Sequence, residues 1–119
     1  MLVDDEPDLL LTYKTNLDSA GYNVDSFTDP IEALMRFASA HHGIYNLVVI
    51  DIRMPNLNGL QLYHRIKTRN PNIKILFVSA LDTAQEMVSI LSDIGLEDVI
   101  RKPADNEQFP SKVKAALKR

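Results

Sequence analysis

The chain has 119 residues, of which 45% are hydrophobic and 24% are charged, and its net charge is -3. This composition is typical of one globular domain, residues 1–119, and argues against intrinsic disorder. The small negative charge gives no reason to expect nucleic-acid binding. The chain has no cysteine, which excludes disulfides and thiolate metal sites. No apolar run approaches the length of a membrane span, and acids begin at Asp4, so we expect no signal peptide and a cytoplasmic protein.

Short apolar segments alternate with segments of helical periodicity along the chain. The clearest strands are residues 47–50 and 73–78, which are nearly continuous in Val, Ile, Leu and Phe, as in parallel strands buried on both faces. Residues 22–27 and 98–100 are weaker strand candidates. Residues 2–3 are short for a strand, and we expect one or two residues upstream of Met1 to belong to it.

Helices are predicted between these strands from apolar stripes and from residues that start or stop helices. The first begins near Pro7 and stops at Gly21, and Asp29 caps the second. A third follows residue 59. A fourth is predicted over residues 83–95, where a capping box precedes an apolar stripe. Asp105 is the expected cap of the fifth.

Acidic residues follow two of the predicted strands. Asp4 and Asp5 follow the first strand, and Asp51 follows the third. Strands alternating with helices imply an α/β fold with a parallel sheet, and in flavodoxin-like sheets ligands bind beyond the carboxyl ends of the first and third strands. Three carboxylates held at that edge would repel one another unless a cation joined them.

A hydroxyl and an ammonium group follow the other two strands. Ser79 comes after the fourth strand and Lys102 after the fifth. Mg²⁺, or Mn²⁺ in its place, prefers oxygen ligands, and lysine and serine can contact phosphoryl oxygens. A carboxylate can itself be the nucleophile that forms an aspartyl phosphate. The residues therefore predict a site for a divalent cation and a phosphoryl group.

Four motifs occur together in one known family. They are VDDEP at residues 3–7, DIRMPNLNG at residues 51–59, VSA at residues 78–80 and KP at residues 102–103. With them, essentially the whole chain resembles the receiver domain of two-component response regulators, in the CheY-like superfamily. The resemblance implies one receiver domain with a doubly wound (βα)5 flavodoxin-like fold. Its five-stranded parallel sheet would have the order 2-1-3-4-5, with helices on both faces.

The resemblance also implies a role for each residue of the site. Asp51 would be the phosphoacceptor, and Ser79 and Lys102 would contact the phosphoryl group. The implied metal ligands are Asp5 and Asp51 directly, Asp4 through water, and Arg53 through its backbone carbonyl. The implied switch and output surface includes Val99 and Arg101.

We therefore expect a regulatory domain of a phosphorelay, which catalyses only its own phosphotransfer and dephosphorylation. The implied donor is a histidine kinase or a phosphotransfer protein, and the implied target is an output domain or another protein. The resemblance also allows a homodimer through the face of the fourth helix, fifth strand and fifth helix. We expect no direct contact of this domain with nucleic acid or membrane.

Three features depart from the usual receiver pattern. Val99 stands where receivers commonly have Tyr or Phe, so the usual coupling to an aromatic side chain cannot operate. Pro110 lies where the last helix should start, which predicts a late start near Pro110 or a distorted first turn. Arg53 and Leu81 would hinder hydrolytic water and slow the loss of phosphate.

Two alternative functions are left open. A binding module that no longer uses phosphate is favoured slightly by Val99 and Pro110. An aspartate-nucleophile phosphatase also forms an aspartyl phosphate, but such enzymes carry a second acid two residues after the nucleophile, where this chain has Arg53.

Overall fold

A computed structural model describes residues 1–52, 54, 57–79, 95–102 and 107–119 of the chain. Several predictions from the sequence lie outside these residues. They concern Arg53, Leu81, Asp105 and the predicted helix over residues 83–95, of which only residue 95 is described.

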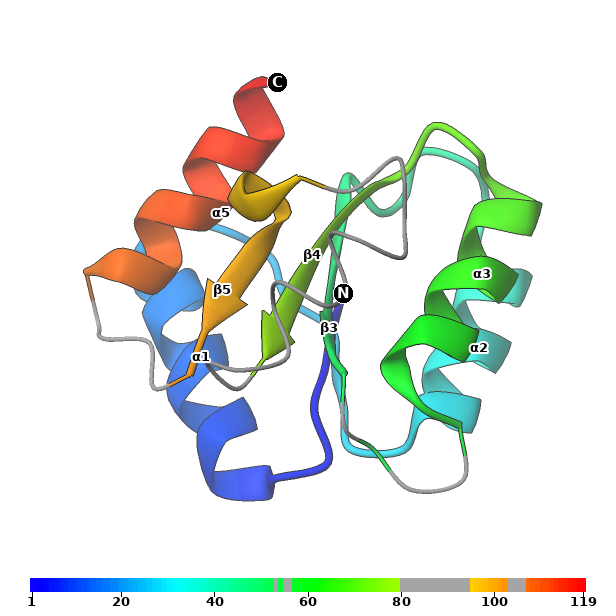
Figure 1. Ribbon diagram of the computed structural model, residues 1–119, viewed down its shortest axis with the longest axis horizontal. Helices are drawn as coiled ribbons and strands as arrows, with labels where there is room; N and C mark the ends of the chain where they lie inside the picture. Colours follow the sequence, from blue (N-terminus) through cyan, green and yellow to red (C-terminus); the bar gives the residue numbers. More distant parts are fainter. Residues whose placement is uncertain (53, 55–56, 80–94, 103–106) are drawn as a thin grey trace.

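The strands form one five-stranded parallel sheet in the order β2-β1-β3-β4-β5, as the family resemblance implied. Figure 1 labels β3, β4 and β5 of this sheet. They are β1 (Leu2–Val3), β2 (Ser26–Phe27), β3 (Leu47–Asp51), β4 (Lys74–Ser79) and β5 (Val99–Arg101). In register, Val3 lies beside Ile50 and Asp51 beside Val78. This alignment brings the carboxyl ends of the strands to a common edge.

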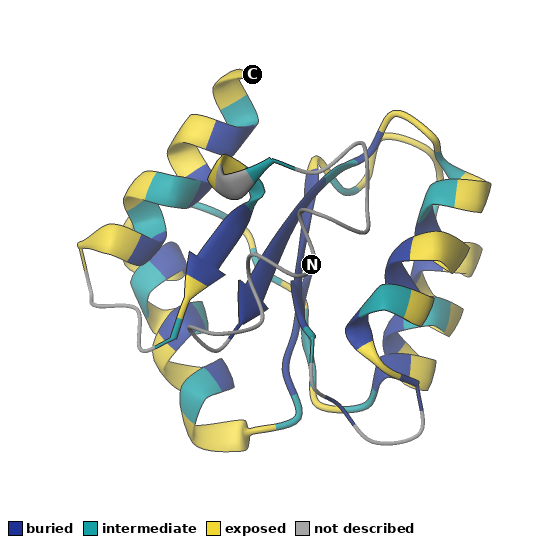
Figure 2. Ribbon diagram, in the orientation of Figure 1, coloured by how far each residue is buried: buried dark blue, intermediate teal, exposed yellow. Residues whose placement is uncertain are grey.

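Among the described residues, two helices cover each face of the sheet. Helices α1 (Pro7–Ser19) and α5 (Gln108–Lys118) lie on one face, and α2 (Pro30–Ser39) and α3 (Gly59–Arg69) on the other (Figure 1). Successive strand residues point to opposite faces, so each strand contributes to two cores. Thus Val48 packs on the α2 and α3 side, whereas Val49 packs on the α1 and α5 side. Figure 2 shows the buried strands between helices whose outer faces are exposed.

The ends of α1 and α2 follow the predicted signals, whereas the N-cap of α5 is Glu107 and not the expected Asp105. Helix α1 ends before Gly21, which adopts a positive φ of 93° and lets residue 22 return a hydrogen bond to Leu17. The Asp29 side chain accepts a hydrogen bond from the backbone N–H of Ile31 and caps α2. Among the described segments, no helix is long and apolar enough to cross a bilayer.

Helix α5 begins at Gln108, two residues before Pro110. Pro110 therefore occupies the first turn, where a backbone N–H would have no partner within the helix, so the proline is accommodated. The preceding residue, Phe109, is fully buried and stacks on Tyr13 of α1, with ring centroids 4.3 Å apart and planes 9° apart. This aromatic pair fixes the first turn of α5 against α1.

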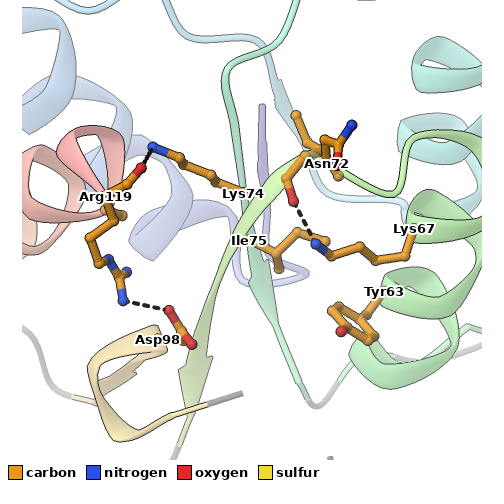
Figure 3. A pocket seen from close by; sticks show the side chains of 9 residues that line it. Tyr63, Lys67, Asn72, Lys74, Ile75, Asp98 and Arg119 are labelled. Atoms are coloured by element: carbon orange, nitrogen blue, oxygen red, sulfur yellow. Dashed lines mark hydrogen bonds and ion pairs between the residues drawn. The ribbon is translucent and has the colours of Figure 1, made fainter. Parts of the chain in front are cut away.

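A cavity of about 230 Å³ lies at the opposite, amino-terminal end of β4 and β5 (Figure 3). The positively charged side chains that line this cavity already have hydrogen-bond or ion-pair partners. Lys67 donates to the carbonyl of Ile73 at 2.7 Å, Lys74 donates to the carbonyls of Leu117 and Arg119, and the Arg119 guanidinium lies 2.8 Å from Asp98. These contacts join α3, β4 and α5, so we assign this cavity a structural role.

Replacing the buried aromatic ring of α5 should destabilise the domain strongly. Phe109→Ala removes the stacked ring and leaves a cavity, so the free energy of unfolding in urea should fall by about 3–5 kcal/mol. Leu11→Ala is the control, because Leu11 is 65% exposed and should change stability by less than about 0.5 kcal/mol. A loss below about 1 kcal/mol for Phe109→Ala would contradict this assignment.

Candidate functional site

The carboxyl edge of the sheet gathers the polar residues that the sequence analysis selected. Asp4, Asp51 and Ser79 are almost completely buried, at 1%, 3% and 2% exposure. Backbone hydrogen bonds hold these strand ends: the N–H of Lys102 donates to the carbonyl of Ser79 at 2.7 Å. The N–H of Asp4 donates to the carbonyl of Phe27 at 3.1 Å.

The Lys102 ammonium lies among three carboxylates. Its Nζ is 3.1 Å from Glu6 Oε1, 3.3 Å from Asp51 Oδ2 and 3.5 Å from Asp4 Oδ2. Although burial lowers the pKa of Lys102, the surrounding carboxylates outweigh it and raise that pKa above its ordinary value. Lys102 is therefore a permanent positive charge at this edge.

Four carboxylates converge around the same point. One oxygen from each of Asp4, Asp5, Glu6 and Asp51 can be chosen so that all lie within 4.8 Å of one another. Asp4 Oδ1 accepts the backbone N–H of Glu6 at 2.9 Å, but its buried Oδ2 has no hydrogen-bond partner among the described residues. An oxygen-only donor set with an unsatisfied buried carboxylate oxygen fits a hard divalent cation such as Mg²⁺. Asp4, Asp5 and Asp51 would hold it.

Burial raises the pKa values of the two deepest acids. Burial raises the pKa of Asp51 to about 7, with the negative charge of Asp4 adding to the effect and Lys102 opposing it. Burial also raises the pKa of Asp4, against the lowering by the Glu6 N–H and Lys102. Lys102 therefore does not fully offset the cost of burying these carboxylates in their charged form, and a divalent cation would reduce that cost.

The segment after Asp51 passes unusually close to the start of α3. A Cβ atom on Gly59 would lie 2.5 Å from the carbonyl oxygen of Asp51 and 2.7 Å from Cα of Ile52. The N–H of Gly59 donates to the carbonyl of Ile52 at 2.9 Å. A capping box between Asn58 and Gln61, which the sequence analysis did not identify, fixes the helix start beside it. Gly59 thus allows the close backbone contact between the start of α3 and residues 51–52.

The structure brings together five of the residues that the sequence selected and adds one. Glu6 was not selected, although it follows the two acids directly and precedes Pro7, which begins α1. Its position just after the acids at the end of β1 was the signal by which the sequence could have identified Glu6 as a site residue. Of the expected switch residues, Val99 is buried in the α2 and α3 core at 4% exposure, whereas Arg101 is exposed.

Adding one methyl group at Gly59 should disturb the backbone of residues 51–52. Gly59→Ala forces backbone atoms apart and should lower the free energy of unfolding by about 1–3 kcal/mol, with amide chemical shifts changed around residues 51–52. Gly21→Ala is a matched control: nothing lies within 4 Å of its Cβ, so only its positive φ is strained. If Gly59→Ala left both stability and these shifts unchanged, the close contact would not constrain the loop.

Neutralising Asp51 should stabilise the metal-free domain at high pH. The native carboxyl keeps its proton up to a pKa of about 7, while the ordinary pKa is 3.8. The native state thus binds more protons between these values, and wild-type stability falls as pH rises through the window. Asp51→Asn lacks this slope, so it should exceed the wild type by about 1–3 kcal/mol at pH 8 and by less at pH 5.

Urea unfolding with a metal chelator at the two pH values measures this difference. Asp8→Asn serves as a control, since Asp8 is an exposed acid in the first turn of α1. Parallel pH profiles for the wild type and Asp51→Asn would contradict the raised pKa of Asp51.

Comparisons with known proteins agree with this geometry. Residues 1–114 match the family model described as the response regulator receiver domain. The chain is 29% identical over its full length to the probable transcriptional regulatory protein TcrX of Mycobacterium tuberculosis and to the response regulator ArlR of Staphylococcus aureus. It covers 49% and 52% of those proteins, so the chain spans about half the length of these curated relatives.

A solved structure has the same fold. A response regulator receiver domain protein from Clostridium thermocellum superposes with a TM-score of 0.86 at 22% identity, covering 99% of this chain and 92% of that one. This likeness shows the fold, and the family match extends over nearly the whole sequence. The chain therefore belongs to the response regulator receiver domain family.

Proposed function

We propose that this receiver domain accepts a phosphoryl group on Asp51 from a phosphohistidine donor and thereby changes its binding to a partner. The observation that carries the proposal is the buried Asp51 carboxylate at the end of β3, with Lys102 Nζ 3.3 Å away and further carboxylates beside it. We would not expect this burial or these charged neighbours for an aspartate that only occupies a solvent-exposed turn.

The protein residues divide the reaction between them. A deprotonated Asp51 oxygen attacks phosphorus, forming a P–O bond as the P–N bond to the donor imidazole breaks. The imidazole nitrogen keeps the electron pair of that bond, and because the other ring nitrogen of the phosphohistidine carries a proton, the donor leaves as neutral imidazole. Lys102 offsets charge on the phosphoryl oxygens, and the Ser79 hydroxyl donates to one of them.

Asp4, Asp5 and Asp51 would hold Mg²⁺, or Mn²⁺ in its place, and the backbone carbonyl of Arg53 is the fourth expected ligand. Bound there, the cation would supply positive charge to the transferred phosphoryl group. The unsatisfied Asp4 Oδ2 and the oxygen-only donor set support this assignment.

Phosphorylation would change the charge and contacts of the strand ends. It adds roughly one to two negative charges and new acceptor oxygens at Asp51. Lys102 and Ser79 are joined by a backbone hydrogen bond between the ends of β5 and β4, so movement of one is transmitted to the other. The exposed Arg101, beside Lys102, would report this change to an output domain, a target protein or a second copy.

We propose that a histidine kinase or phosphotransfer protein donates the phosphoryl group to this domain. We propose that an output domain or target protein then responds to the phosphorylated domain, in the cytoplasm. Family membership supports both partner classes. A phosphate-independent binding module remains the second candidate, because the small, buried Val99 cannot supply the aromatic switch of the usual pattern.

Labelling with a small phosphodonor separates these functions. With acetyl phosphate and Mg²⁺, the intact mass should rise by one phosphoryl group, and Asp51→Asn or a chelator should abolish the increase. Asp18→Asn, which removes an exposed acid of α1, should label like the wild type. Failure of the wild type to label, both with acetyl phosphate and with a phosphohistidine donor, would favour the phosphate-independent module.

A further inference from the structure

Glu6 is a charged residue of the site to which neither the family motifs nor the proposed mechanism gives a task. Its Oε1 makes the shortest of the three carboxylate contacts of Lys102, at 3.1 Å, and accepts a hydrogen bond from the ammonium group. Glu6 is also the most exposed of these partners: its side chain is 57% exposed, against 2% for Asp4 and 4% for Asp51. It lies at the rim of the site.

The backbone of Glu6 is fixed on both sides. Its N–H donates to Asp4 Oδ1 at 2.9 Å, and its carbonyl accepts the N–H of Leu10 at 3.0 Å. Pro7 follows as the first residue of α1 and restricts the chain further. The Glu6 carboxylate is thus held beside the acidic cluster by the same turn that places Asp4.

Lys102 and a divalent cation require the same oxygens. Lys102 Nζ lies 3.3 Å from Asp51 Oδ2 and 3.5 Å from Asp4 Oδ2, and these two acids would also hold Mg²⁺. Two positive charges in one small, buried site repel each other. Cation binding therefore requires the Lys102 ammonium to weaken its ion pairs with Asp4 and Asp51. Its third carboxylate partner, Glu6, can then still pair with it.

We propose that Glu6 is a positioning residue, which holds the Lys102 ammonium at the rim of the site and so leaves the inner carboxylates available to a divalent cation. This inference rests on the proposed function, because it assigns Asp4 and Asp51 to the cation. It also explains how a lysine that pairs with these acids in the metal-free protein coexists with the cation.

Mg²⁺ titration of a double-mutant cycle, followed by calorimetry, tests the proposal. Glu6→Gln should weaken Mg²⁺ binding by about two- to fivefold, the range of an exposed ion pair. In a Lys102→Ala background the same change should have little effect, because no ammonium remains to be held. The side-chain ¹⁵N signal of Lys102 in the metal-free protein should move in Glu6→Gln.

A matched control isolates the role of position from that of charge. Asp8→Asn also removes one exposed negative charge near the start of α1, and it should weaken Mg²⁺ binding less than Glu6→Gln does. Both variants should keep the free energy of unfolding of the wild type in chelator to within about 0.5 kcal/mol.

Two results would overturn the inference while leaving the proposed function intact. Equal weakening by Glu6→Gln with and without Lys102 would show that Glu6 acts on the cation directly. An effect no larger than that of Asp8→Asn would show that only overall charge matters. In contrast, a wild type that neither binds Mg²⁺ nor labels with acetyl phosphate would overturn the proposed function and this inference with it.

Discussion

The carboxyl edge of this receiver domain depends on one charge balance: among the described residues, four carboxylates converge there, and a single ammonium group lies within 3.5 Å of three of them. Lys102 offsets only part of their repulsion, and burial leaves Asp51 with a pKa of about 7. Such a site is poorly satisfied as it stands, since Asp4 Oδ2 lacks a hydrogen bond among the described residues. The imbalance favours a divalent cation, and the cation together with Lys102 would then favour an added phosphoryl group.

The fold produces this imbalance through ordinary packing. Strands β1, β3 and β4 lie between helices on both faces, and the parallel register of the sheet places polar residues at one edge (Figure 1). Hydrogen bonds between the strand ends, such as Lys102 N–H to the Ser79 carbonyl, hold the backbone from which these side chains project. Burial of apolar side chains in the two cores thus offsets the free-energy cost of holding like charges close together.

Sequence patterns predicted the elements and their order well because apolar runs and helix signals are local. The strand ends at Asp51 and Ser79 followed directly, and the family motifs supplied the strand order. Contacts between distant residues were harder: Glu6 meets Lys102 across 96 positions, and no local pattern reports that pairing. The start of α5 before Pro110 depends on Phe109 packing against Tyr13, which is also a tertiary contact. The predicted helix over residues 83–95 remains a prediction.

The central claim is that Asp51 is the residue that becomes phosphorylated, and chemical trapping tests it most directly. Borohydride reduces an acyl phosphate on aspartate to homoserine, which tandem mass spectrometry locates after treatment of the protein with acetyl phosphate and Mg²⁺. We expect homoserine at position 51 and at no other acid of the cluster. Homoserine at position 4 or 5, or none at all in protein that carries phosphate, would contradict the assignment of Asp51 as the phosphoacceptor.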